Sequence, residues 1–199
     1  EVQLLGQQCR VERIGTDGDI SAAVQLIGDL DGRVDAIGLG GIDLYLCVGS
    51  RRWVIRDARR LADAASRTPV VDGSGLKDTL ERRTIQNLHD RGTLAPERHP
   101  DDVQVMVVSG ADRFGLAEAL VSLGYRCIFG DLIYAVGLPI PVHSLRALET
   151  AARLLCPLIC RLPFTVLYPI GSRQEDSRAT GSPYFEKADI VAGDFHYIR

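Results

Sequence analysis

The segment 103–132 constrains the fold of this chain more than any other part of the sequence. Mostly apolar residues make up 103–108, a short polar turn follows, a helical pattern covers 113–123, and a second mostly apolar run occupies 125–129. A strand, a turn, a helix and a strand in this order predict a βαβ unit. The two strands of such a unit are parallel, because the helix returns the chain to the same end of the sheet.

Strand and helix patterns also alternate along the rest of the chain. The predicted strands are 9–14, 34–39, 44–48, 53–55 and 69–71, and the predicted helices are 20–30, 57–65, 76–88 and 144–155. Such alternation is typical of α/β proteins. We therefore predict an α/β chain with a Rossmann-like layered fold, in which a mostly parallel sheet is covered by helices on both faces.

The run 91–102 separates two halves of the chain. It contains charges and prolines without periodicity, which predicts a linker or a long surface loop. We expect an N-terminal α/β half over 1–95 and a Rossmann-like C-terminal half over 103–199. Because the chain starts without a methionine and stops abruptly, we expect the C-terminal half to be truncated.

Composition argues against several classes of protein. Of the 199 residues, 46% are hydrophobic and 25% are charged, as in globular proteins rather than disordered ones. The net charge of −3 gives no general attraction for nucleic acid. The apolar stretch 145–170 is interrupted by arginines and prolines, so we expect no membrane span. The five cysteines form no paired motif and no signal peptide is visible, so we expect a cytoplasmic protein with reduced thiols and no metal site.

The turn after the strand 103–108 is the first candidate site. Backbone N–H groups at the start of a helix favour a phosphate. Asp131 ends the next strand, 21 positions after Gly110, close to the spacing at which an acidic residue binds a ribose hydroxyl in NAD-type folds. In the plain structural alternative, Asp112 caps the helix and Gly115 allows tight packing. The candidate cofactor-binding residues are Ser109, Gly110, Asp112, Arg113, Gly115 and Asp131.

The turn 72–78 is the second candidate site. Lys77 lies in the first turn of the predicted helix 76–88, and Asp72 lies across the loop from it. A lysine beside an aspartate can bind a substrate hydroxyl and transfer its proton, so Lys77 and Asp72 are the candidate catalytic residues. In the structural alternative, Asp72 or Ser74 caps the helix and Lys77 is solvated.

Two other segments give weaker signals. The glycines of 38–41 are followed by a strand pattern, so they fit a bend better than a nucleotide-binding loop, although Asp43 could still line a pocket. Near the C-terminal end, Asp194 and His196 follow an apolar run and could face the same crevice as the other candidates.

Long blocks of sequence spread along the chain also favour one family. They are 38–46, 68–82, 111–115, 129–133 and 193–198. In these blocks the chain resembles a bacterial family known as quinate 5-dehydrogenases, over nearly its whole length. The resemblance implies a Rossmann-like oxidoreductase that uses NAD or NADP on an alicyclic polyhydroxy acid such as quinate or shikimate. Better-understood quinate and shikimate dehydrogenases have a glycine-rich nucleotide loop, whereas this chain has only Gly110 and Gly115 at that place.

These observations leave several functions open. The leading hypothesis is an NAD(P)-dependent oxidoreductase with a small-molecule substrate. The alternative is a non-redox Rossmann-like module that binds a phosphorylated or acidic metabolite at the same two turns. A third is an interaction or membrane-peripheral protein that docks through 145–170. Each of these functions is compatible with a homo-oligomer.

Overall fold

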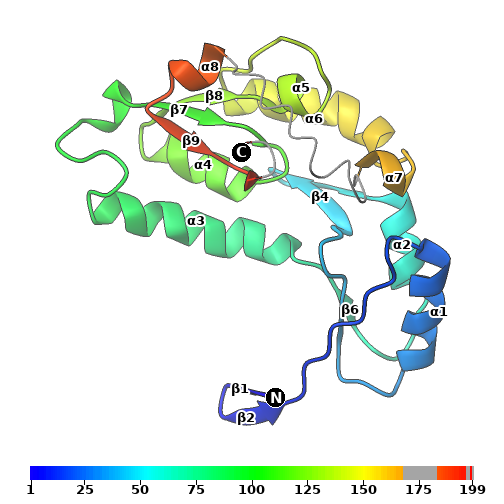
Figure 1. Cartoon of the computed structure of the whole chain (residues 1–199). Helices are drawn as coiled ribbons and strands as arrows, with labels where there is room; N and C mark the ends of the chain where they lie inside the picture. Colours follow the sequence, from blue (N-terminus) through cyan, green and yellow to red (C-terminus); the bar gives the residue numbers. More distant parts are fainter. Residues whose placement is uncertain (168–182, 196–197, 199) are drawn as a thin grey trace.

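The computed structural model describes residues 1–167, 183–195 and 198. Its main sheet contains the two strands of the segment 103–132. β7 (Gln104–Val107) and β8 (Arg126–Phe129) are parallel, with Val105 beside Cys127. β9 (Ile190–Ala192) pairs in parallel with the other side of β7, which gives the order β8-β7-β9 (Figure 1). The predicted βαβ unit is confirmed.

Helices enclose this sheet. α4 (Phe114–Ser122) connects β7 to β8, and α3 (Ser74–Asp90) runs along α4 (Figure 1). α6 (Leu145–Ile159) contributes apolar side chains to the same core. Val105 and Met106 point to opposite faces of β7, and both are buried. Because both faces of β7 are covered, its residues from Val105 onward form a continuous apolar run without polar alternation.

A smaller core lies in the N-terminal part. β3 (Ile37–Gly38) pairs in parallel with β6 (Val70–Val71). α1 (Ile20–Leu30) and α2 (Arg56–Ala62) pack beside this short ladder. α1 begins where the sequence predicts, because the Asp19 side chain accepts two backbone N–H groups of its first turn.

Two antiparallel hairpins complete the N-terminal part. β4 (Tyr45–Val48) and β5 (Arg51–Val54) form the hairpin that the sequence predicts. β1 (Val2–Leu4) and β2 (Gln7–Cys9) form another, which is not predicted. The predicted strand 9–14 is wrong: this segment is irregular, and pairing ends at Cys9.

The α/β class is confirmed, with a difference in how the strands are joined. The described strands form four small sheets instead of one continuous sheet, and two of the four are parallel. β3 and β6 have only two residues each, and among the described strands neither pairs with a strand of the main sheet.

The remaining described segments are short helices and loops. The run 91–102 is irregular apart from a 3-10 turn at Pro100–Asp102, as predicted. α5 (Asp131–Tyr134), α7 (Phe164–Leu167) and α8 (Pro183–Glu186) are each about one turn long. Among the described residues, no helix is long and apolar enough to cross a membrane.

Candidate functional site

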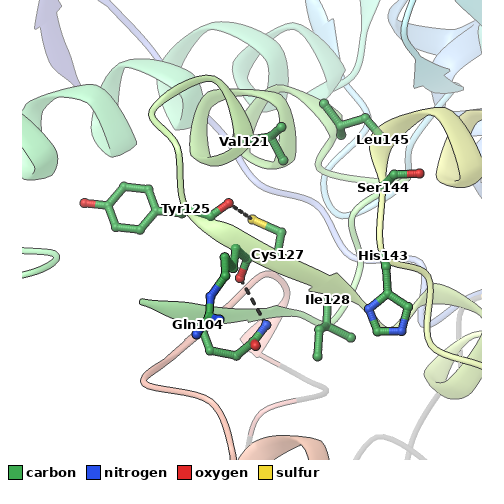
Figure 2. A pocket seen from close by; sticks show the side chains of 9 residues that line it. Gln104, Val121, Tyr125, Cys127, Ile128, His143, Ser144 and Leu145 are labelled. Atoms are coloured by element: carbon green, nitrogen blue, oxygen red, sulfur yellow. Dashed lines mark hydrogen bonds between the residues drawn. The ribbon is translucent and has the colours of Figure 1, made fainter. Parts of the chain in front are cut away.

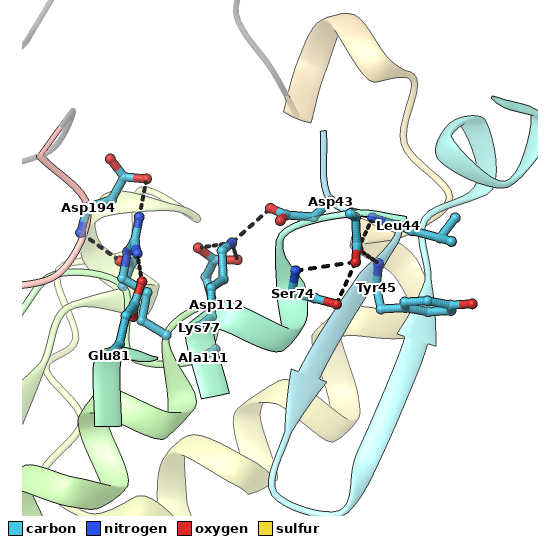
Figure 3. Close-up of polar contacts among 12 residues, drawn as sticks. Asp43, Leu44, Tyr45, Ser74, Lys77, Glu81, Ala111, Asp112 and Asp194 are labelled. Atoms are coloured by element: carbon cyan, nitrogen blue, oxygen red, sulfur yellow. Dashed lines mark hydrogen bonds and ion pairs between the residues drawn. The ribbon is translucent and has the colours of Figure 1, made fainter. Parts of the chain in front are cut away.

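Three distant segments meet around Lys77 (Figure 3). The Nζ atom of Lys77 donates to Oδ2 of Asp43 at 2.8 Å and to the two carboxylate oxygens of Asp112 at 2.7 and 2.8 Å. Asp43 precedes β4, Lys77 lies in the first turn of α3, and Asp112 lies between β7 and α4. We call these three residues the Lys77 cluster. It joins the N-terminal part of the chain to the main sheet.

Lys77 keeps its charge in this partly buried position. Its side chain is 19% exposed. Burial alone would lower the pKa of Lys77, but the carboxylates of Asp112 and Asp43 outweigh burial and raise the pKa above its ordinary value. At neutral pH Lys77 is therefore an ammonium group, which can donate three hydrogen bonds.

A second ionic group lies beside the first (Figure 3). Arg113 contacts Glu81 through Nη1 and donates through Nη2 to Oδ2 of Asp194 at 3.4 Å. Glu81 is one turn after Lys77 on α3, and Arg113 follows Asp112 in the chain. The two groups together hold four carboxylates and two cations, so the surroundings of Lys77 are net acidic.

A close contact between α3 and α4 sets the position of both groups. A Cβ atom at Gly115 would lie 2.8 Å from the Cα of Asp78 and from the carbonyl oxygen of Lys77. Real side chains do not approach a backbone so closely, so only glycine allows this helix contact. The structure thus gives Gly115 the tight-packing role of the structural alternative. The same contact brings Lys77 within reach of Asp112.

Asp72 does not contact Lys77 and has a different role. Its carboxylate accepts the backbone N–H groups of Leu44 at 2.6 Å and Tyr45 at 3.3 Å. It also accepts the N–H of Ser74 at 3.2 Å and the Ser74 hydroxyl at 2.7 Å. Burial would raise the pKa of Asp72, but these hydrogen bonds outweigh burial and lower it. The predicted Lys77–Asp72 partnership is therefore wrong, because the Asp72 oxygens are occupied in joining β6 to β4 and α3.

We expect Asp72→Asn to lower the free energy of unfolding by about 1 kcal/mol at neutral pH, because an amide cannot accept all four hydrogen bonds. A lowered pKa stabilises the fold above the unfolded-state value of 3.8, and that stabilisation is lost as pH falls through the folded-state pKa. The difference between the variant and the wild type should therefore shrink below pH 3.8.

Urea unfolding at pH 7 and pH 3.5, roughly either side of the unfolded-state pKa, measures this difference. Asp63→Asn is the matched control, because Asp63 forms only an exposed ion pair with Arg59 among its described contacts and is expected to contribute little. Equal losses in the two variants would contradict the role assigned to Asp72.

Asp131 is the first residue of α5, and its carboxylate lies against the turn between β7 and α4. Its carboxylate accepts the N–H of Gly110 at 3.0 Å and the N–H of Ala111 at 2.7 Å. Burial raises the pKa of Asp131 to about 6, and the two backbone hydrogen bonds oppose that shift. The residue predicted to bind a ribose hydroxyl thus binds the backbone of its own chain.

The described residues do not fit a dinucleotide at this turn. Two amides that could bind a pyrophosphate already donate to Asp131, and Gly115 is covered by α3. Asp112 and Arg113 are held in ion pairs. Asp112 also does not cap α4, whose first turn has no side-chain cap. Ser109 is buried, and its hydroxyl accepts the N–H of Asp194 at 3.2 Å.

Two hollows in the described part of the structure could hold a ligand. A pocket of about 100 Å³ opens beside the Lys77 cluster. Its lining includes Tyr45, Cys47, Ser74, Lys77, Asp112 and Phe114. A larger groove of about 440 Å³ follows the outer edge of β8 (Figure 2). There Gln104 and Cys127 donate to backbone carbonyls, and the lining includes none of the sequence-predicted site residues. The smaller pocket is therefore the candidate site.

The structure assembles some residues that the sequence did not link. Asp43 and Asp194, each noted as a candidate neighbour of a pocket, reach Lys77 and Arg113 respectively. Glu81 was not a candidate, although its spacing of four from Lys77 places both on one face of α3. His196 lies outside the described residues. Within the described ranges, no group of three His, Cys, Asp or Glu residues is placed to hold a metal ion.

The fold and the site define a mixed α/β protein with a partly buried lysine–aspartate cluster beside a small pocket. The chain belongs to a family described as a domain of unknown function (DUF8754), whose model matches residues 75–199. Residues 1–72 match a second model, also described as a domain of unknown function (DUF8753). No curated protein and no solved structure matches the chain.

Proposed function

We propose that this protein binds a small hydroxylated compound at the Lys77 cluster and exchanges a proton with one of its hydroxyl groups. The observation that supports the proposal is the ammonium of Lys77, held within 2.8 Å of Asp43 and Asp112 on the wall of a pocket. A lysine–carboxylate pair of this kind serves as an acid–base group for alcohols and ketones. The pocket admits one end of such a compound.

Each member of the cluster has a distinct task in this proposal. Lys77 is protonated, so it donates a hydrogen bond to a ligand oxygen and transfers its proton to an alkoxide, which becomes a hydroxyl while the lysine becomes a neutral amine. Asp112 accepts the hydrogen bond of a neighbouring hydroxyl while it keeps Lys77 charged. Asp43 fixes the direction of the ammonium from the opposite side.

The charge of the site restricts the ligand. Of the charged residues, Lys77, Asp78 and Asp112 line the pocket. The ion pairs of Lys77 and Arg113 join four carboxylates to two cations, so both cations are already paired. An acidic or phosphorylated compound would be repelled, whereas an uncharged or cationic polyol would find many hydrogen-bond acceptors. This favours a neutral polyhydroxylated ligand over quinate, shikimate or a phosphorylated metabolite.

The oxidoreductase hypothesis rests on the family resemblance. An alcohol as substrate agrees with it, and NAD or NADP would then supply or accept the hydride. The described residues of the turn between β7 and α4 do not fit this cofactor, so we assign no reaction step to the cofactor. We retain the Rossmann-like layered fold as part of the proposal, since β8-β7-β9 is fully parallel. The five free cysteines agree with a cytoplasmic location.

Binding of the proposed ligand can be detected directly by the NMR signal of the side-chain nitrogen of Lys77. The chain has two lysines, Lys77 and the exposed Lys187, so a protein labelled with ¹⁵N at lysine gives two Nζ signals. Titration with myo-inositol or glucosamine is expected to shift the Lys77 signal in a saturable way and leave that of Lys187 unchanged. Equal responses of the two lysines to both compounds would contradict the site, and tighter binding of quinate would contradict the predicted ligand charge.

A further inference from the structure

The turn between β7 and α4 has the backbone of an anion-binding site, but an aspartate of the same chain fills it. Exposed N–H groups at the end of a parallel strand are the usual position for a phosphate in α/β proteins. In this chain the N–H groups of Gly110 and Ala111 point at the carboxylate of Asp131, at 3.0 and 2.7 Å. A carboxylate that accepts backbone N–H groups offers them the same interaction as a phosphate oxygen.

Side chains pack closely around Gly110. A Cβ atom at Gly110 would lie 2.7 Å from Cδ1 of Phe129, 3.1 Å from Cδ2 of Leu148 and 3.3 Å from Oδ2 of Asp131. Phe129 and Leu148 are almost fully buried. The missing side chain of Gly110 therefore leaves room for the Phe129 ring, the Leu148 side chain and the Asp131 carboxylate to lie against the turn.

We propose that Asp131 is a built-in anion whose carboxylate takes the place of a nucleotide phosphate at this turn. By holding Gly110 and Ala111, it positions the next two residues of the chain, Asp112 and Arg113. With Gly110 and Ala111 held by Asp131, Asp112 is directed to Lys77, and Arg113 is directed to Glu81 and Asp194. Asp131 is thus a positioning residue for the Lys77 cluster. The proposal is independent of the ligand that the cluster binds.

The wild-type chain gives the first test. Backbone amide signals of Gly110 and Ala111 are followed by NMR while NAD, NADP, ADP or pyrophosphate is added to millimolar concentration. We expect no saturable shift of either amide. A saturable shift of both amides with any of these compounds would overturn the proposal, whether or not polyols bind at Lys77.

Chemical rescue gives the second test. Asp131→Ala removes the carboxylate, so formate is expected to raise the melting temperature of this variant in a saturable way and to return the Lys77 Nζ signal toward its wild-type position. Asp189→Ala is the matched control, because Asp189 also accepts a backbone N–H, from Gln104, but is exposed. Equal effects of formate on both variants, or none on Asp131→Ala, would contradict the built-in anion. If Asp131→Ala does not fold, the wild-type titration decides alone.

Discussion

A Gly115→Ala variant is expected to lose about 2 kcal/mol of folding free energy, although alanine is a better helix former than glycine. The added Cβ atom would lie 2.8 Å from the Cα of Asp78 and from the carbonyl oxygen of Lys77. Both are backbone atoms of α3, so turning a side chain cannot relieve the contact and the two helices must move apart. Because this movement separates Lys77 from Asp112, we also expect the Nζ signal of Lys77 to shift.

Gly28→Ala is the matched control for this prediction. Gly28 also lies inside a helix, α1, but there the nearest described atom to an added Cβ would be the carbonyl oxygen of Ala64, at 3.8 Å. With room available, the higher helix propensity of alanine should stabilise this variant by up to about 1 kcal/mol. Urea unfolding of both variants measures the difference. A Gly115→Ala variant as stable as Gly28→Ala would show that α3 and α4 are not in close contact.

The parts of the fold that the sequence predicts are those with local patterns. The unit from β7 to β8 is continuous in the chain, and each of its elements carries its own apolar periodicity. The place of β9 is not predictable in this way, because Val105 and Ile190 pair across a long stretch of chain. The hairpin of β1 and β2 is also missed, since each strand has only three residues and almost all of them are exposed.

The candidate site is harder still to predict from the sequence, because it too depends on contacts between residues that are far apart in the chain. Lys77 and Asp112 are both candidates in the sequence, but they are 35 positions apart and meet only through the packing of α3 on α4. Sequence proximity favours Asp72 as the partner of Lys77, and Asp72 instead bonds to backbone N–H groups 27 and 28 positions away. Asp131 has the expected spacing from Gly110, but its carboxylate accepts the backbone N–H group of Gly110 and is not left available for a ribose hydroxyl.

The Lys77 cluster itself should have the largest effect on stability. Lys77→Met keeps the length of the side chain but leaves the carboxylates of Asp43 and Asp112 without their ammonium. Breaking a buried pair costs about 3–5 kcal/mol, and the partial exposure of these side chains reduces the expected loss to about 2–4 kcal/mol. Lys187→Met, which changes an exposed lysine, should have almost no effect.

A second substitution separates the charge of Asp112 from the packing of Lys77. In Lys77→Met, burial raises the pKa of Asp112 with one fewer cation to oppose it, so the loss of stability should be greatest at neutral pH and shrink as pH falls through that raised pKa. Adding Asp112→Asn removes the charge and should restore at least about 1 kcal/mol at pH 7. Urea unfolding of the four proteins in this cycle, at pH 5 and pH 7, measures both effects. Strictly additive losses would mean that Lys77 and Asp112 do not interact, and the proton-transfer pair would then have no basis.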